Sequence, residues 1–180
     1  MAITKKNVPR ARRRPAKVVV AVSGGFDPIH IGHVRMFERA RALGDELVVI
    51  LNNDNWLTKK KGAPFMPERE RKEVIEGLRA VDRVVITTHE PEPEDMSVSR
   101  DLRALHPDIF ANGGDRDEKN AANPASSLYK DIATCKELGI EMVFNIGDGG
   151  KVQSSSWLIE KERKRARKNS TAVGEAKKKD

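Results

Sequence analysis

The sequence predicts an α/β protein built on an open parallel sheet with helices on both faces. Short apolar runs rich in Val and Ile alternate along the chain with segments whose apolar residues recur at helical spacing. Hydrophobic residues make up 38% of the 180 residues but aromatic residues only 4%, so the core must consist mainly of aliphatic side chains. Aliphatic runs of this kind are typical of strands that are buried on both faces, as in a parallel sheet.

The first predicted unit is a strand at residues 17–22, followed by a turn and a helix that runs to Leu43. The turn reads SGGFDP at residues 23–28, and the helix begins beside the sequence HIGH. The start of a helix favours anions, because its first amides have no partners within the helix and the helix dipole is positive there. The junction between this strand and this helix is therefore a candidate phosphate site.

Two histidines, His30 and His33, lie at this helix start. Their spacing of three places both rings on the same side of the helix, where each can donate a hydrogen bond to phosphate oxygens. Gly32 between them allows the backbone to approach a ligand closely. The alternative is structural, with His30 as a turn residue and His33 as a helix-end histidine whose partners lie within the fold.

The alternation of strands and helices continues to the end of the chain. Further strands are predicted at residues 46–52, 84–88, 108–111 and 141–146. Further helices are predicted at residues 67–81, 98–105 and 126–138 and from about residue 154 onward. The first strand, helix and second strand form a βαβ unit, for which a right-handed crossover is expected.

Residues 53–67 are predicted to form a loop at the carboxyl end of the second strand, where ligands of open α/β sheets bind. The run Lys59 to Lys61 can neutralise phosphates there, or it is simply an exposed basic loop. Arg71 follows in the early turns of the next helix, where the dipole disfavours a cation. This local conflict indicates that a basic side chain is needed for an anion.

Two later stretches add polar groups at the same edge of the sheet. Gly113 and Gly114 permit close approach of the backbone after the fourth strand, and Asp115 can bind a ribose hydroxyl, a base amine or a structural amide. The serines at residues 154–156 are placed to cap the last helix, and their hydroxyls and amides can also bind phosphate.

Charge and composition divide the chain into three parts. We expect a disordered basic arm at residues 1–16, one domain at residues 17–160, and a charged helix end and tail at residues 161–180. The net charge of +7 belongs largely to these ends, which either bind nucleic acid or polyphosphate by counterion release or are solvated tails. No aromatic residues are interleaved with the basic ones, which argues against nucleic-acid binding outside the tails.

The single cysteine, Cys135, excludes an internal disulfide and a multi-cysteine metal site. Apolar runs fall well short of the roughly 20 residues that cross a bilayer, and the first residues lack the apolar segment of a signal peptide. We therefore expect a cytoplasmic protein that does not act at a membrane.

The motifs together resemble those of the cytidylyltransferase-like nucleotidyltransferases, the small HxGH-bearing relatives of class I aminoacyl-tRNA synthetases. The resemblance rests on GGFDP with HIGH, then KKG with PERER, then NGGD, then SSS, all in the family's order. The phrases ERARALGDELVV and LRAVDRVV are similar to those of glycerol-3-phosphate cytidylyltransferases and heptose-1-phosphate adenylyltransferases. The resemblance covers residues 17–160 and implies a Rossmann-like fold.

The resemblance also implies a reaction. A CMP or AMP group would pass from CTP or ATP to a phosphorylated sugar, polyol or headgroup, with release of pyrophosphate and with Mg²⁺ bridging phosphate oxygens. No protein metal ligands are expected, although Asp27 supports the turn or helps to hold the ion. The implied catalytic residues are His30, His33, Lys61 and Arg71. The implied nucleotide-binding residues are Gly24, Gly25, Phe26, Asp27, Gly32, Gly113, Gly114, Asp115, Ser154, Ser155 and Ser156.

The sequence leaves other functions open. GGFDPIH and SSS occur in similar form in pantetheine-phosphate and nicotinamide-mononucleotide adenylyltransferases, and a non-catalytic nucleotide- or nucleic-acid-binding module could keep the same fold. A tRNA synthetase is not favoured, because the chain is too short for an anticodon-reading module and has no KMSKS-like loop. The base, the phosphorylated acceptor and the formation of a homodimer, which is common among similar proteins, are not fixed by these motifs.

Overall fold

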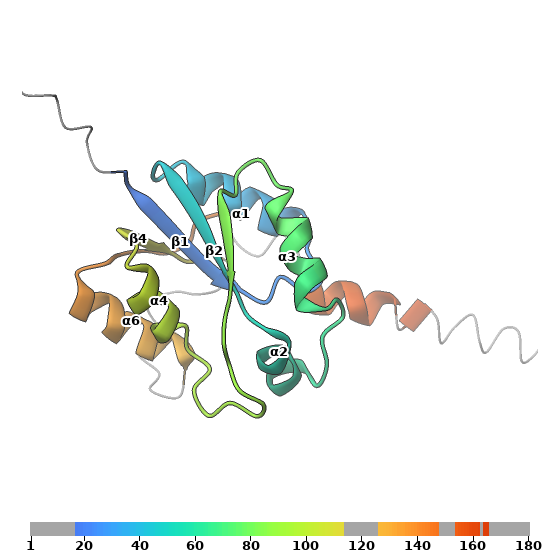
Figure 1. Ribbon diagram of the computed structural model, residues 1–180. Coiled ribbons are helices and arrows are strands. Elements are labelled where there is room, and N and C mark those ends of the chain that lie inside the picture. Colours follow the sequence, from blue (N-terminus) through green and yellow to red (C-terminus); the bar gives the residue numbers. More distant parts are fainter. Residues whose placement is uncertain (1–16, 114–125, 148–153, 163, 166–180) are drawn as a thin grey trace, which may run out of the picture.

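The computed structural model describes residues 17–113, 126–147, 154–162 and 164–165. Five parallel strands form one sheet in the order β3-β2-β1-β4-β5, and the chain reverses its direction of travel across the sheet between β1 and β4 (Figure 1). The strands are β1 (Val19–Gly24), β2 (Glu46–Leu51), β3 (Arg83–Ile86), β4 (Ile109–Ala111) and β5 (Glu141–Val143). The predicted Rossmann-like α/β fold is confirmed. Ligands of such sheets bind at the carboxyl ends of the strands near this reversal.

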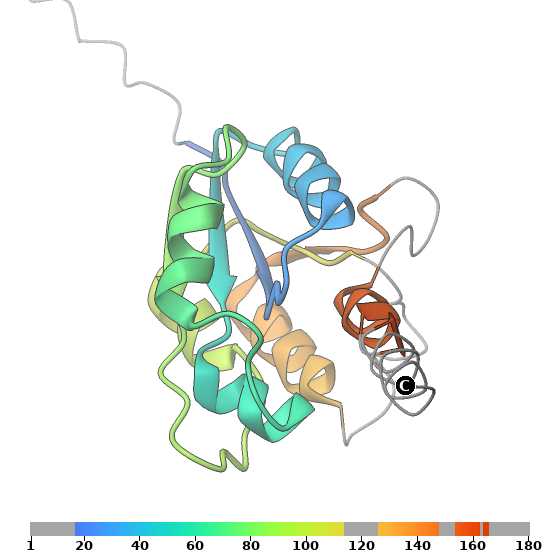
Figure 2. The ribbon, with the colours of Figure 1, turned by 90° about the vertical axis from the view of Figure 1, so that its right-hand side faces the viewer.

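Helices cover both faces of the sheet (Figures 1 and 2). The first face carries α1 (Ile31–Arg41) and α3 (Glu68–Glu76), and the second carries α4 (Ser99–Leu105) and α6 (Ser127–Leu138). A shorter helix, α2 (Asp54–Lys61), follows β2, and residues 155–162 are also helical. This last helix extends away from the sheet (Figure 1).

Side chains of successive strand residues alternate between two hydrophobic clusters. On β2, Leu51 packs into the cluster that contains Phe37 of α1. Its neighbour Ile50 packs into the cluster that contains Leu102 of α4 and Cys135 of α6. Both faces of the sheet are therefore buried, which explains why the strands are continuous aliphatic runs in the sequence.

The prediction of a loop over residues 53–67 is wrong, because α2 lies within it. Its N-cap is Asn53, whose side chain accepts a hydrogen bond from the amide of Trp56 at 3.0 Å. Trp56 and Leu57 are buried, and the three lysines occupy the last turn, where the helix dipole favours cations. A helix with only two adjacent apolar residues has no helical hydrophobic period, so its pattern could not be recognised.

Other predicted boundaries differ by a few residues. The structure ends α3 at Glu76 with Gly77 as its C-cap, whereas the sequence analysis extended this helix to residue 81. The first strand lies at Val19–Gly24 rather than at residues 17–22, and the last is Glu141–Val143 rather than 141–146. Strand and helix ends depend on hydrogen bonds and caps that the hydrophobic pattern does not report.

Several predictions fall outside the described residues. These are the basic arm at residues 1–16, Gly114, Asp115 and most of the tail beyond residue 165.

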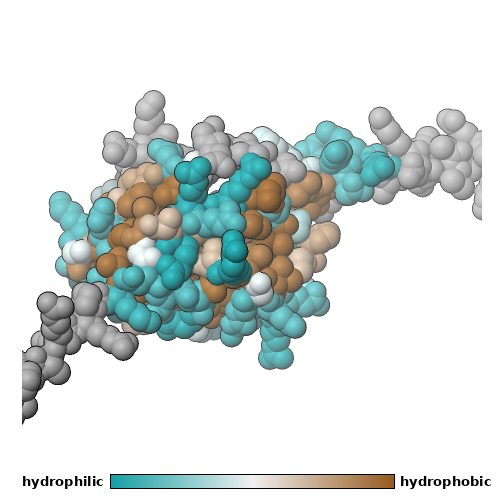
Figure 3. Space-filling model, turned by 90° about the horizontal axis from the view of Figure 1, so that it is seen from above, coloured by the Kyte–Doolittle hydropathy of each residue, from teal (hydrophilic) through white to brown (hydrophobic). Residues whose placement is uncertain are grey.

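Within the described ranges, none of the helices has the length and apolar character needed to cross a membrane. Seen from above, hydrophobic side chains are interspersed with hydrophilic ones on the surface (Figure 3). Homodimer formation stays a prediction.

Candidate active site

The turn after β1 is packed tightly around the ring of Phe26, which is 6% exposed. This ring contacts the rings of His33 and Phe37 edge-on, each with a centroid distance of 5.0 Å. A Cβ atom on Gly24 would lie 2.8 Å from the Phe26 ring, and one on Gly25 would lie 2.7 Å from Leu57 Cδ2. Gly24 therefore allows the Phe26 ring that contacts His33 to pack closely, and Gly25 allows the close approach of Leu57 of α2.

The rings of His30 and His33 stack with a centroid distance of 3.6 Å and an angle of 19° between their planes. The spacing predicted this shared side of the helix. His33 Nδ1 accepts a hydrogen bond from the backbone N–H of His30 at 3.3 Å, so the proton of the neutral ring is on Nε2. A Cβ atom on Gly32 would lie 3.1 Å from the His30 ring, so a larger residue would require that ring to shift by a few tenths of an ångström.

Both histidines are neutral at physiological pH. Burial lowers the pKa of His33 to about 3, with further lowering by His30 and Lys61. Burial also lowers the pKa of His30, as does the nearby charge of Lys61. A neutral imidazole has one N–H donor, and the Nε2–H of His33 is available to a phosphate oxygen.

Asp27 holds the segment that follows α2 against the turn. It is 1% exposed, and its two carboxylate oxygens accept hydrogen bonds from the amides of Phe65 at 2.7 Å and Met66 at 2.8 Å. Its backbone carbonyl accepts a hydrogen bond from Lys61 Nζ at 3.0 Å. Lys61 is an exposed residue whose ammonium group contacts the turn. Burial lowers the pKa of Lys61, and the charge of Asp27 opposes this shift. Lys61 and the histidines are thus brought together around one loop.

Arg71 is 1% exposed and lies beneath this loop. Its guanidinium donates to the carbonyls of Met66, Gly25 and Asn52 at 2.9, 2.7 and 2.8 Å. It also pairs with the carboxylate of Asp54 at 2.6 Å. Four of its five N–H groups are therefore used by the fold, which explains why a cation is found early in α3. Direct contact of Arg71 with a phosphate stays a prediction.

The serines at residues 154–156 lie beside the turn after β1, although they are distant from it in the sequence. Ser155 Oγ donates to the carbonyl of Pro28 at 2.9 Å across 127 positions of sequence. Ser154 and Ser155 are buried, whereas Ser156 is exposed. Gly113 packs against α1, since a Cβ atom there would lie 2.5 Å from Met36 Sδ. Motifs that lie far apart in the sequence thus come together in one cluster at the carboxyl edge of the sheet.

The sequence analysis did not single out Asn52, the residue after β2. It is 2% exposed, and its Oδ1 is buried without a hydrogen-bond partner among the described residues. The only signal in the sequence is a polar residue at the carboxyl end of a buried strand, next to Asn53 and Asp54. That position coincides with the edge at which the histidines and Lys61 lie.

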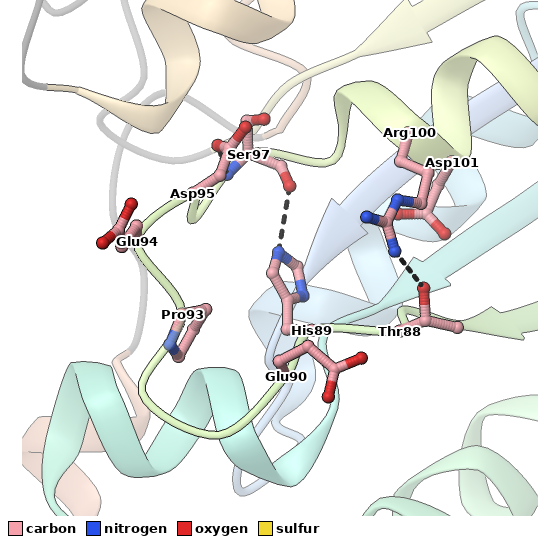
Figure 4. Close-up of a pocket in the computed structure, with 9 residues that line it drawn as sticks. All are labelled: Thr88, His89, Glu90, Pro93, Glu94, Asp95, Ser97, Arg100 and Asp101. Atoms are coloured by element: carbon pink, nitrogen blue, oxygen red, sulfur yellow. Dashed lines mark hydrogen bonds between the residues drawn. The ribbon is translucent and has the colours of Figure 1, made fainter.

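A cavity of about 190 Å³ lies elsewhere, in the segment between β3 and α4. Figure 4 shows it lined by residues that include His89, Arg100 and Asp101, and none of the predicted site residues lines it. His89 Nε2 lies 3.0 Å from the carbonyl of Ser97. We place the candidate active site at the histidines, because the chemistry of phosphate transfer requires converging hydrogen-bond donors, and most of the charged groups around this cavity are carboxylates.

Within the described residues, no group of three His, Cys, Asp or Glu side chains is arranged to hold a metal ion. The carboxylate of Asp27 is already bonded to two amides and that of Asp54 to Arg71. Single carboxylates of this kind fit a Mg²⁺ ion only if substrate phosphates and water supply most of its oxygen ligands.

The described residues thus form an α/β protein in which the first strand of a parallel sheet leads through a glycine turn into a helix headed by two stacked histidines. Residues 21–171 match the family model described as cytidylyltransferase-like. The chain belongs to this family.

Three known proteins illustrate the similarity. The chain is 40% identical over 102 residues to an FAD synthase of Pyrococcus abyssi, a match that covers 56% of this chain and 66% of that protein. It is 38% identical over 158 residues to the bifunctional protein HldE of Syntrophotalea carbinolica, covering 87% of this chain but only 29% of that protein. A crystal structure of a lipopolysaccharide core biosynthesis protein from Thermoplasma volcanium superposes with a TM-score of 0.58 at 26% identity, covering 74% of this chain and 99% of that one.

Proposed function

We propose that the chain transfers the nucleotidyl group of a nucleoside triphosphate to a phosphorylated small molecule and releases pyrophosphate. The observation that carries this proposal is the stacked pair of neutral histidines at the start of α1, with Lys61 drawn to the same turn. A phosphate oxygen of the acceptor attacks the α-phosphorus, and the bond from that phosphorus to the bridging oxygen of pyrophosphate breaks. This in-line displacement needs no covalent enzyme intermediate.

The residues act by positioning and by neutralising charge. His33 donates from Nε2 to an oxygen of the α-phosphate, and His30 lies beside it at the stacking distance of 3.6 Å. Lys61 binds phosphate with the N–H groups that the carbonyl of Asp27 does not use. The hydrogen bonds of Arg71 and Asp27 hold the turn after β1 and the segment after α2 in their conformations. Gly114 and Asp115 are assigned to the nucleotide by family resemblance alone.

The serines anchor the triphosphate in this proposal. Ser156 is exposed at the start of the last helix, while Ser155 fixes that helix to the turn through Pro28. The first amides of the helix and the hydroxyl of Ser156 favour the β- and γ-phosphates. Mg²⁺, when bound, neutralises the phosphates and stabilises the leaving pyrophosphate, and the chain contributes at most single carboxylates to it.

The relatives suggest candidates for the phosphorylated acceptor and for the base of the nucleotide. The name FAD synthase describes a protein that forms a compound in which AMP is joined to FMN, so ATP with FMN is one pair to test. The family name suggests CTP as the alternative nucleotide. The polyol and sugar phosphates that the sequence resemblance implies are the other acceptors to test.

The test is pyrophosphate release with Mg²⁺ and ATP or CTP in turn, with FMN, glycerol 3-phosphate, a hexose 1-phosphate or phosphocholine as acceptor. We expect release with one nucleotide and one acceptor class, and its loss in His30→Ala and in His33→Ala. Arg69→Ala is the matched control, because Arg69 is an exposed cation of α3. Binding of nucleotide without release for any acceptor, and with an unchanged affinity in both histidine variants, would support a non-catalytic binding module instead.

A further inference from the structure

Asn52 is held in the fold by its backbone and not by its side chain. Its N–H donates to the carbonyl of Gly24 at 2.9 Å, and its carbonyl accepts from Arg71 Nη1 at 2.8 Å. Its side chain is 2% exposed, and Oδ1 has no hydrogen-bond partner among the described residues. Leaving a buried amide oxygen without a donor destabilises a protein, so such groups call for an explanation.

The neighbouring asparagine shows the contrast. Asn53 is 7% exposed, and its Oδ1 accepts from the amide of Trp56 at 3.0 Å. Its Nδ2 donates to the carbonyl of His89 at 2.8 Å. Asn53 therefore accounts for the capping of α2 and for the connection to the segment after β3. Among the residues that the structure describes, none gives the side chain of Asn52 a structural role of this kind.

The position of Asn52 points to the substrate that it would meet. Residues of β2 alternate between faces, so Asn52 continues the face of Ile50, on the side of α4 and α6. It lies beside the end of β1 on the β2 side, whereas Gly113 follows β4 on the opposite side of β1. The family resemblance implies that the turn after β4 binds the nucleotide, which leaves the β2 side of the histidines for the second substrate.

We propose that the side-chain amide of Asn52 is a specificity-determining contact for the phosphorylated acceptor, accepting a hydrogen bond from one of its hydroxyl or amine groups. This inference rests on the proposed function and adds to it that the acceptor carries such a donor close to its phosphate. An acceptor without this donor would leave the buried Oδ1 unpaired and would be rejected. The discrimination against that compound is expected to be tenfold or more, on the order of the effect of an unpaired buried polar group.

The first test needs no substrate. Asn52→Leu replaces the amide by an apolar group of similar size, so the melting temperature of the free protein should be unchanged or higher. Asn55→Leu is the matched control, because Asn55 Nδ2 donates to the carbonyl of His89 at 2.9 Å and its loss should lower the melting temperature. A fall for Asn52→Leu as large as that for Asn55→Leu would overturn the proposal by showing a structural role.

The second test uses the acceptor that wild type turns over among FMN, glycerol 3-phosphate and a hexose 1-phosphate. Turnover of phosphocholine alone would contradict the proposal, because that compound has no hydroxyl or N–H group beside its phosphate. The ratio of kcat/KM for that compound to kcat/KM for its analogues lacking one hydroxyl or amine is measured in both proteins. Wild type should prefer the intact compound over one analogue at least tenfold, and Asn52→Leu should lose this preference while its nucleotide affinity is unchanged. Asn52→Ser, which shortens the side chain and removes the amide, is a second variant in the same comparison and should lose part of the preference.

The outcomes separate the two proposals. Turnover by wild type with the same preference in the Asn52 variants would overturn the role of Asn52 and leave nucleotidyl transfer standing. Absence of turnover with every acceptor and both nucleotides would overturn the proposed function and this inference with it. Loss of preference with an unchanged melting temperature and unchanged nucleotide affinity is the result that supports both.

Discussion

Arg71 and Asp54 form an ion pair of 2.6 Å in which the side chain of the arginine is 0% exposed and that of the aspartate 35% exposed. The pair joins the start of α2 to α3, and the same guanidinium holds the carbonyls of Gly25, Asn52 and Met66. One side chain thus ties together the turn after β1, the end of β2 and the segment before α3. The shape of the candidate site depends on this cross-link.

Arg71→Lys should lower the free energy of unfolding by about 2–3 kcal/mol, because a lysine cannot replace the planar fork that reaches four acceptors. Urea denaturation measures this loss. Arg69→Lys, at an exposed position of the same helix, is the control and should change the stability little. Equal stabilities for both variants would show that the cross-link is not important for the fold.

Asp27→Asn should lower the free energy of unfolding by about 1–3 kcal/mol in the absence of nucleotide and Mg²⁺, since an asparagine offers only one acceptor atom to the two amides of Phe65 and Met66. Thermal unfolding of the free protein measures it. If the variant lost activity but kept its full stability, Asp27 would have to be assigned to the ion rather than to the turn.

Gly32→Ala should separate activity from stability. Alanine is a better helix former than glycine, yet its Cβ atom would lie 3.1 Å from the ring of His30 and displace it. We expect an unchanged or higher melting temperature with a loss of about tenfold or more in kcat, since small displacements of catalytic groups are costly. Gly77→Ala is the control, because a Cβ atom there has its nearest neighbour at 3.5 Å. Full activity of Gly32→Ala would argue against a role for the position of His30.

The stability of the protein should fall below pH 6.5, partly through His33. Its pKa is about 3 in the folded protein and near 6.5 in the unfolded chain, so the unfolded chain binds the proton first as the pH falls. Between pH 7 and pH 5 this contributes a loss of about 1–2 kcal/mol, which the variant His33→Gln should lack. Denaturation of both proteins across this range measures the difference. Parallel pH profiles would mean that His33 is not buried as a neutral ring.

Much of the fold could be predicted, because both faces of the sheet are buried and the strands are recognisable as aliphatic runs. The cluster of histidines, Lys61 and serines could also be predicted, from motifs in a known order. The helix α2 could not, since a helix held by the cap of Asn53 and by Trp56 and Leu57 has no apolar stripe. The structural use of Arg71 depends on contacts with residues 5 to 46 positions away and appears only in three dimensions. The same holds for Oδ1 of Asn52, which has no partner among the described residues.

Nucleotidyl transfer is tested most directly by following two radioactive labels of the nucleoside triphosphate, one in the α-phosphate and one in the γ-phosphate. With the acceptor and Mg²⁺ present, the α-label should appear in the product joined to the acceptor and the γ-label in pyrophosphate. Neither product should form with His33→Ala. Appearance of the γ-label on the acceptor would contradict the assignment of this site to nucleotidyl transfer. So would appearance of the α-label only in free nucleoside mono- or diphosphate, with none of it joined to the acceptor.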